Sequence, residues 1–150
     1  MNCFPDTSIL CSTYRTQIHS PRTDAFMTKL IGPLPVSTFL LLEFRQSLRL
    51  PTRLHAPDKT KGFARNESAL MLRDLQSDLA AWVLEVVPVD WAEVHQIAER
   101  LSATHTERNG HRLADLMHGA TALHLGATQF LTFDRNQQLL AEAEGMTVPV

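Results

Sequence analysis

Short apolar, strand-like runs alternate with longer helix-like segments along the whole chain. The runs predict strands over residues 1–5, 34–36, 83–89, 130–133 and 146–148. The segments between them predict helices over residues 8–18, 22–31, 38–50, 67–80, 90–101, 112–125 and 136–143. This alternation is typical of a mostly parallel sheet covered by helices on both faces. The sequence therefore predicts an α/β fold, a three-layer α/β/α sandwich around a central sheet of four or five short strands.

Local signals mark the ends of several predicted helices. Ser37 or Thr38 can cap the helix over 38–50, and Asn66 can cap the helix over 67–80. Asp90 begins a D-x-x-E pattern before an amphipathic helix, which is typical of a helix start. Residues 51–62 contain two prolines, a glycine and several charges, so we expect them to form a connection.

The length and composition indicate one compact soluble domain over residues 1–150. A chain of 150 residues with 44% hydrophobic composition can form a core without covalent staples. Only Cys3 and Cys11 are present, which favours a reduced, intracellular setting over a disulfide framework. No signal-peptide pattern or apolar run of about 20 residues occurs. We therefore expect a cytoplasmic protein that does not associate with membranes.

Four acids, Asp6, Glu43, Asp115 and Asp134, lie at separate boundaries between an apolar run and a helix-like segment. In an α/β fold the carboxyl ends of the strands meet on one side of the sheet, where ligands bind. Two carboxylates about 5 Å apart repel each other by about 3 kcal/mol at an effective dielectric near 20. A divalent cation removes this repulsion, and oxygen ligands favour Mg²⁺ or Mn²⁺. The four acids together predict a metal site.

Each acid also has an ordinary structural interpretation. Asp6 and Asp134 can be N-caps, and Asp115 can interact favourably with the dipole at the start of its helix. Glu43 interrupts the most apolar stretch of the chain, although a surface position on a half-buried helix would also explain it. The metal-site prediction therefore depends on the joint placement of the acids, and no single acid decides it.

Three side chains on one helix form a rival metal site. His111, Asp115 and His118 lie on one helical face, and two imidazoles with a carboxylate suit zinc or iron. In the alternative interpretation His111 is a surface residue and His118 hydrogen-bonds a neighbour. His124 falls on the apolar face of the same helix, so we expect it to be a core histidine with its hydrogen bonds satisfied.

The motifs around the four acids resemble those of PIN-domain ribonucleases. Residues 6–8 (DTS) after a short strand resemble the opening motif of that family, and residues 42–44 (LEF) resemble its second acidic position. Residues 111–122 are similar to the helix that carries the third acid, and residues 131–134 (LTFD), followed by Gln137, resemble the fourth motif. The likeness covers essentially the whole chain in the right order. Pro5 departs from it by replacing an apolar strand end.

The resemblance implies a Mg²⁺- or Mn²⁺-dependent endoribonuclease that hydrolyses RNA phosphodiester bonds, often the VapC-type toxin of a toxin–antitoxin pair. It implies an RNA substrate, a cognate antitoxin and a homodimer. Asp6, Asp115 and Asp134 would be metal ligands, and Glu43 would bind metal or orient the attacking water. Ser8 and Thr132 would supply hydroxyl contacts.

A local group of basic residues is the candidate surface for a polyanionic partner. The net charge of −2 gives no global case for nucleic-acid binding. Six of the fourteen basic residues nevertheless lie in one short span, and they can contact RNA phosphates or an acidic antitoxin segment. Ordinary solvated helix and loop charge would also explain them. They are Arg45, Arg49, Arg53, Lys59, Lys61 and Arg65.

Clustered acids also occur in two other functional classes. A PIN-like binding protein would keep the acids but act mainly through assembly with a partner and show little or no turnover. A receiver-like phosphoacceptor domain would need an acidic pair near the N-terminus and a late lysine, and no lysine follows Lys61. The receiver interpretation is therefore set aside.

Overall fold

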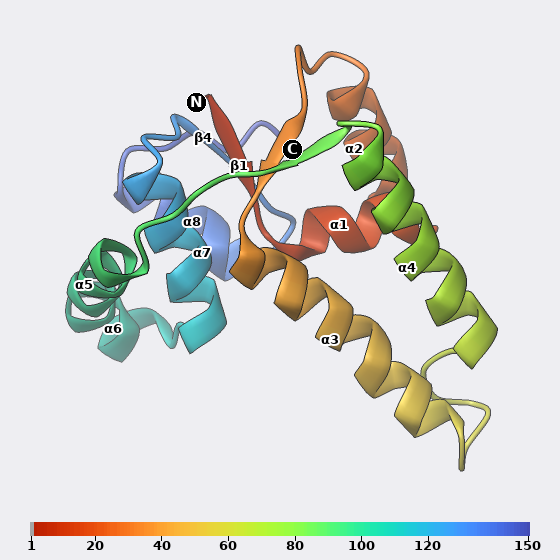
Figure 1. Ribbon diagram of the computed structural model, residues 1–150. Coiled ribbons are helices and arrows are strands. Elements are labelled where there is room, and N and C mark those ends of the chain that lie inside the picture. Colours follow the sequence, from red (N-terminus) through yellow and green to blue (C-terminus); the bar gives the residue numbers. More distant parts are fainter. Residues whose placement is uncertain (1) are drawn as a thin grey trace.

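The computed structural model describes residues 2–150 and has short parallel strands at its centre (Figure 1). The strands are β1 (Cys3–Pro5), β2 (Leu34–Val36), β3 (Leu84–Val86) and β4 (Gln129–Leu131). β1 pairs with β4, β2 pairs with β3, and β1 lies next to β2. The spatial order is therefore β3-β2-β1-β4. Over the described residues, ladder hydrogen bonds join the strands only within the two pairs.

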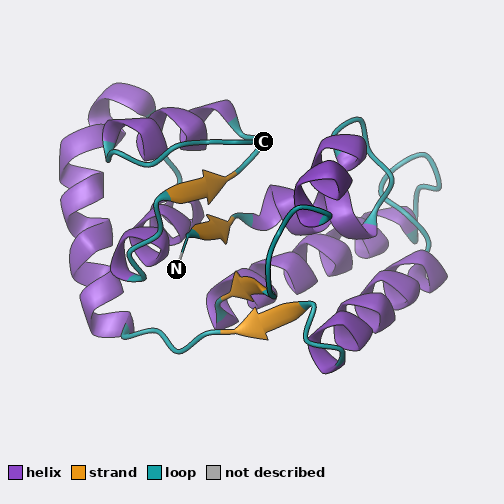
Figure 2. Cartoon of the chain, turned by 90° about the horizontal axis from the view of Figure 1, so that it is seen from above, coloured by secondary structure: helices purple, strands orange, loops and turns teal. Residues whose placement is uncertain are grey.

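Helices flank the strands on both sides (Figure 2), which confirms the predicted α/β class and its parallel strands. Within residues 2–150, no helix has both the length and the apolar character that a membrane span requires. The helical elements are α1 (Thr7–Tyr14), α2 (Ser20–Met27), α3 (Thr38–His55), α4 (Arg65–Ala80), α5 (Trp91–Leu101), the π-helical turn η1 (Ser102–Thr106), α6 (Glu107–Asn109), α7 (Leu113–His124) and α8 (Arg135–Ala143).

The strands are shorter than the sequence predicts. The strand predicted over 83–89 is confined to β3, and the strand predicted over 130–133 ends at Leu131. The strand predicted over 146–148 is reduced to one parallel bridge between Thr147 and Gln129. Pro5 ends β1 and Pro35 lies in the middle of β2, and neither residue can donate a ladder hydrogen bond.

Two apolar clusters hold the elements in place. The larger cluster contains the fully buried side chains of Phe4, Leu34 and Phe130 and extends to the helices α1, α3 and α4. The smaller cluster joins α5, α7 and α8 through residues such as Leu101 and Leu140. Because β1, α3, α7 and β4 all contribute to these clusters, the elements that carry the four acids are fixed by packing.

The helix predicted over 38–50 continues as α3 to His55, so the predicted connection over 51–62 is wrong for residues 51–55. Pro51 lies inside α3, where its missing N–H removes one intrahelical hydrogen bond. The following loop folds back against this point. Gly62 has φ +62°, and a Cβ added to it would lie 2.0 Å from the carbonyl oxygen of Pro51.

The predicted helix starts are confirmed at two positions and wrong at another. The side chains of Ser37 and Asp90 accept backbone hydrogen bonds of 3.1 Å and 2.9 Å at the starts of α3 and α5. α4 instead begins after Ala64, so Asn66 lies inside the helix and does not cap it. The helices predicted over 8–18 and 22–31 are α1 and α2, and each ends earlier than predicted.

Candidate active site

Asp6 follows β1, caps α1 and is almost completely buried. Its Oδ1 accepts hydrogen bonds from the N–H and Oγ of Ser8, at 2.9 Å and 2.5 Å. Its Oδ2 accepts from Thr132 Oγ1 at 2.6 Å and from Gln137 Nε2 at 2.7 Å. Burial raises the pKa of the Asp6 carboxyl, and the hydrogen bonds from Ser8 and Thr132 oppose that rise. Since a carboxylate has about four acceptor positions, these hydrogen bonds occupy all the acceptor positions of Asp6.

Asp134 lies beyond the end of β4 and is exposed. Its side chain accepts from the N–H of Gln137 at 3.0 Å, so it caps α8. Its own N–H donates to Thr132 Oγ1 at 2.9 Å. The Thr132 hydroxyl therefore links Asp6 to Asp134. The parallel pairing of β1 with β4 brings these chain ends together, and the N–H of Asp6 donates to the carbonyl of Leu131 at 3.0 Å.

Asp115 lies in the first turn of α7 and is half-buried. Its Oδ2 accepts a 3.2 Å hydrogen bond from the backbone N–H of Arg112. Burial raises the pKa of the Asp115 carboxyl, the Arg112 hydrogen bond opposes the rise, and the nearby charge of Asp134 adds to it. The repulsion that the sequence predicted between acids therefore acts between Asp115 and Asp134.

Glu43 reaches the site from α3. Its Oε2 accepts hydrogen bonds from Thr7 Oγ1 and, at 2.5 Å, from His118 Nε2. Burial raises the pKa of the Glu43 carboxyl, but the hydrogen bonds from His118 and Thr7 outweigh it and hold the pKa below its ordinary value. Thr7 is next to Asp6 in the chain, so Glu43 lies beside the start of α1.

His118 is the buried centre of the site. It is 1% exposed, it binds Glu43, and its positive form would interact favourably with Asp6 and Asp115 as well. The i+3 spacing from Asp115 correctly placed His118 on the side of the helix that carries this acid. The predicted hydrogen bond to an unnamed neighbour is confirmed, and that neighbour is Glu43.

Gln137 and Thr7 are the other residues whose contacts the sequence did not predict. Gln137 is buried in the first turn of α8 and holds Asp6, while its Oε1 has no partner within residues 2–150. Its position three residues after the cap Asp134 points it back toward the strand ends. Thr7 lies one residue from Asp6 and donates to Glu43.

The four predicted acids thus lie around one region, but their carboxylates do not converge on a single position. Among the described residues, no group of three or more His, Cys, Asp or Glu side chains is spaced to hold a metal ion. The carboxylate oxygens are the donor type that Mg²⁺ and Mn²⁺ prefer. Asp115 and Asp134 have acceptor positions to offer, whereas Asp6 would have to exchange one of its hydrogen bonds to become a ligand.

The histidines of the rival site do not converge. His111 is 6% exposed, so the surface position predicted for it is wrong, and neither ring nitrogen has a partner within residues 2–150. Burial lowers the pKa of His111, and the charge of Asp115 opposes this effect. His118 instead binds Glu43. His124 is only half-buried, so the core position predicted for it is wrong. The predicted partners of its ring are present, since one ring nitrogen accepts the N–H of Asp90 at 3.2 Å and the other lies 3.1 Å from the carboxylate of Glu93.

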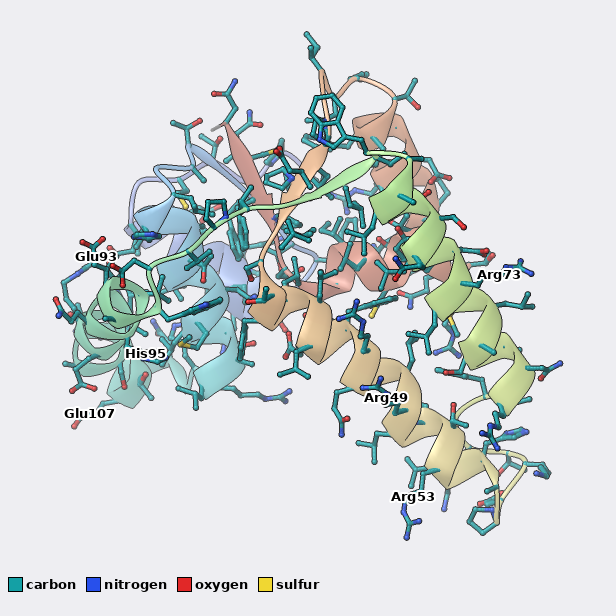
Figure 3. The ribbon with its side chains drawn as sticks, in the orientation of Figure 1. Arg49, Arg53, Arg73, Glu93, His95 and Glu107 are labelled. Atoms are coloured by element: carbon teal, nitrogen blue, oxygen red, sulfur yellow. The ribbon has the colours of Figure 1, made fainter. Side chains whose placement is uncertain are left out.

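The predicted basic residues begin next to Glu43 and continue away from it along α3. Arg45, Arg49 and Arg53 recur at intervals of four residues, which separates them by about 6 Å along the helix axis. Arg49 and Arg53 are exposed on the half of α3 that is farther from the strands (Figure 3). Arg65 begins α4 beside the end of α3, and Lys61 forms an exposed ion pair of 3.3 Å with a loop aspartate.

Comparison with known proteins agrees with this fold. The crystal structure of FitAcB from Neisseria gonorrhoeae has a TM-score of 0.69 and 20% identity, over 97% of this chain and 95% of that chain. VapC20 of Mycobacterium tuberculosis, described as a sarcin-ricin loop cleaving toxin, has a TM-score of 0.67 and 18% identity, over 97% of both chains. A search of curated proteins gave no match. The family model described as "PIN domain" matches residues 3–143, so this chain belongs to the PIN domain family, whose members are generally nucleases.

Proposed function

We propose that this protein is a Mg²⁺- or Mn²⁺-dependent endoribonuclease that hydrolyses RNA phosphodiester bonds. The observation that carries the proposal is the meeting of Asp6 and Asp134 through Thr132 at the carboxyl ends of β1 and β4, with Asp115 beside Asp134. Open α/β sheets bind ligands at this edge. Membership of the PIN family supports the nuclease class.

The acids would hold the cation with oxygen ligands. Asp115 and Asp134 would bind it directly, and Asp6 would bind it directly or through a water. When bound, such an ion supplies a water of lowered pKa and positive charge against the phosphate. The hydrogen bonds from Ser8 and Thr132 keep Asp6 oriented during substrate binding. In the absence of substrate these bonds also keep a buried carboxylate from being left without partners.

Glu43 would orient the attacking water or serve as a further ligand. Burial would raise its pKa, but the hydrogen bonds from His118 and Thr7 offset this effect, so the carboxylate is ionised at neutral pH, as both roles require. His118 and Thr7 hold one of its two oxygens, so the other remains available to water. His118 and Thr7 would therefore be positioning residues, because they act through Glu43.

We further propose that the nuclease is the toxin of a toxin–antitoxin pair and forms a homodimer. The fold likeness to VapC20, itself described as a toxin, supports the first part. Exposed apolar side chains beside the acids are consistent with protein partners, since Leu42 is 59% and Leu113 is 74% exposed. Growth arrest on expression, relieved by a small protein encoded immediately upstream, would support the toxin role. The solution mass tests the dimer.

The direct test of the nuclease is RNA cleavage by protein purified free of any antitoxin. We expect cleavage with Mg²⁺ or Mn²⁺, none with EDTA, and loss of at least about a hundredfold in Asp115→Asn and Asp6→Asn. Asp74→Asn is the matched control, since Asp74 is exposed on α4 and pairs with Arg73. Equal cleavage by wild type and Asp115→Asn would overturn the assignment.

The second candidate is a PIN-like binding protein with little or no turnover. The saturation of Asp6 by four hydrogen bonds favours it, because a ligand must displace one of them. RNA cleavage separates the two candidates, and thermal melting tests the metal site apart from turnover. A nuclease site should be stabilised by Mn²⁺ in the wild type and not in Asp115→Asn, since binding to the folded state raises stability by mass action.

A further inference from the structure

The ring of Phe133 is contacted by two side chains from the start of α2, an imidazole and a guanidinium. The ring of His19 is nearly parallel to that of Phe133, with centroids 4.3 Å apart and an interplanar angle of 8°. The guanidinium carbon of Arg22 lies 5.3 Å from the centroid of the same ring. His19 and Phe133 are half-buried and Arg22 is exposed, so the group reaches solvent. We call these three residues the stacking platform.

The stacking platform is attached directly to the acids. Phe133 lies between Thr132 and Asp134 in the chain. Its N–H donates to Ser8 Oγ at 3.0 Å, and the same hydroxyl donates to Asp6 at 2.5 Å. A ligand stacked on the platform would therefore lie next to two of the four acids.

The position of α2 is also fixed. The buried hydroxyls of Ser12 and Thr23 lie 2.5 Å apart and join α1 to α2. Ser20 Oγ donates to the carbonyl of Ser12 at 2.7 Å. His19 is thus presented by a rigid connection, so the order that stacking requires is already present before a ligand binds.

We propose that the stacking platform binds an unpaired nucleobase of the RNA and so positions the neighbouring phosphate at the acids. This inference rests on the proposed function. Unpaired bases stack on aromatic rings and on guanidinium planes, and such stacking tolerates different sequences because every base has a π-face. The positive charge of Arg22 adds attraction to the RNA backbone beside a cluster of carboxylates that would otherwise repel it.

A second contact between an arginine and a phenylalanine ring belongs to the core and has a purely structural role. Arg15 lies over the ring of Phe63 at 4.8 Å, but Phe63 is 4% exposed and belongs to the core. The stacking platform differs because Phe133 is half-buried and lies beside the acids. The Arg15–Phe63 pair therefore provides the control.

The test uses the full-length protein and a single-stranded RNA probe of about ten nucleotides that carries 2-aminopurine at successive positions, with EDTA present. In the wild type we expect quenching of the fluorescence at one position, because the base stacks there. His19→Ala and Arg22→Ala should lose the quenching and bind about tenfold more weakly. His19→Phe should keep both, since it retains a planar ring.

Two controls separate stacking from charge and from stability. Arg15→Ala removes the same charge as Arg22→Ala and should bind the probe as the wild type does. An abasic nucleotide at the quenched position should weaken binding to the wild type by about tenfold and leave the His19→Ala variant unchanged. Thermal melting checks that each variant is folded.

The outcomes distinguish this inference from the function on which it rests. If the His19 and Arg22 variants bind and cleave RNA as the wild type does, while Asp115→Asn is inactive, the platform proposal is overturned and the nuclease proposal stands. If the wild type neither binds nor cleaves RNA, both are overturned. Equal losses in Arg15→Ala and Arg22→Ala would show a charge effect and would also overturn the platform proposal.

Discussion

The Nε2 of His118 lies 2.5 Å from Oε2 of Glu43, and this hydrogen bond joins α7 to α3 across the candidate site. An ionised carboxylate only accepts hydrogen bonds, so the imidazole Nε2–H is the donor. The ring of Phe39 packs 5.3 Å from the ring of His118 and keeps water from this side. The pair therefore fixes the one acid that reaches the site from α3.

Replacing His118 should raise the pKa of Glu43. Burial alone raises this pKa, and in His118→Leu only the Thr7 hydrogen bond would oppose it. The wild-type carboxyl has a pKa below its ordinary value of 4.5, so its stabilising effect is complete above that pH and is lost as the pH falls through the lower, folded-state pKa. The stability gap between wild type and His118→Leu should therefore be largest near neutral pH and shrink in acid.

Urea denaturation across this pH range measures the gap, and carbon NMR of the Glu43 carboxyl measures its pKa. His118→Gln is the matched control, because its amide can still donate to Glu43 and should give a smaller change. A stability gap that does not vary with pH would contradict the interpretation, since a purely packing defect would behave in that way.

The hydrogen bonds around Asp6 predict a difference between two substitutions. Asp6→Ala leaves donors from Ser8, Thr132 and Gln137 buried without an acceptor, and we expect a loss of about 3 kcal/mol in unfolding free energy. Asp6→Asn keeps one acceptor oxygen. Its new amide can donate to the otherwise unpartnered Oε1 of Gln137 once that side chain flips. We therefore expect Asp6→Asn to cost about 1 kcal/mol.

Chemical denaturation of both variants tests this expectation. The Asn variant should remain folded and lose RNA cleavage, which makes it the cleaner probe of metal binding. Equal destabilisation by Ala and Asn would show that the charge of Asp6, and not the acceptor count, determines its contribution.

The positions of the acids at the ends of strands and the starts of helices could be predicted from the sequence. Asp6 and Asp134 each end an apolar run and cap a helix, and parallel strands then bring both residues to one edge of the sheet. The bonds that complete the site could not be predicted, because they join distant positions. Glu43 and His118 are 75 residues apart, and Asp6 and Gln137 are 131 residues apart.

The end of α3 was mispredicted for a related reason. Proline is a local helix-breaking signal, so Pro51 led to the prediction that residues 51–55 are not helical. In the structure, α3 continues past the proline to His55, and the following loop folds back so closely that a Cβ on Gly62 would lie 2.0 Å from the carbonyl oxygen of Pro51. This contact between loop and helix is a tertiary effect that a single sequence does not reveal.

Gly62, in the loop that follows α3, should be more sensitive to substitution than the other glycines of positive φ. Its φ of +62° disfavours any side chain, and an added Cβ would clash with the carbonyl oxygen of Pro51 at 2.0 Å. We expect Gly62→Ala to lower the unfolding free energy by about 3 kcal/mol, because backbone atoms must move. Gly110 has a similar φ of +69° with no atom near the added Cβ.

Gly110→Ala is therefore the control for backbone strain without a clash, and it should cost about 1 kcal/mol. The comparison by thermal or urea unfolding isolates the Gly62–Pro51 contact. If both variants lose the same stability, the loop can move away from Pro51 and the contact contributes nothing.

The exposed arginines of α3 predict how RNA binding depends on salt. Arg49 and Arg53 form no ion pair with any residue in 2–150, so both are free to contact phosphates (Figure 3). Each phosphate neutralised on a single strand contributes about 0.7 to the slope of log K against log salt. We therefore expect the double variant Arg49→Gln/Arg53→Gln to bind RNA more weakly and to lower that slope by about 1.4.

Arg73→Gln is the matched control for this prediction. Arg73 is also exposed but lies on α4 and pairs with Asp74 at 3.2 Å, so its charge is already compensated (Figure 3). Its substitution should leave the slope unchanged, because an arginine that does not meet a phosphate releases no counterion. A slope that falls equally in the α3 and α4 variants would mean that RNA responds to net charge alone, and the basic face of α3 would then have no special role in binding.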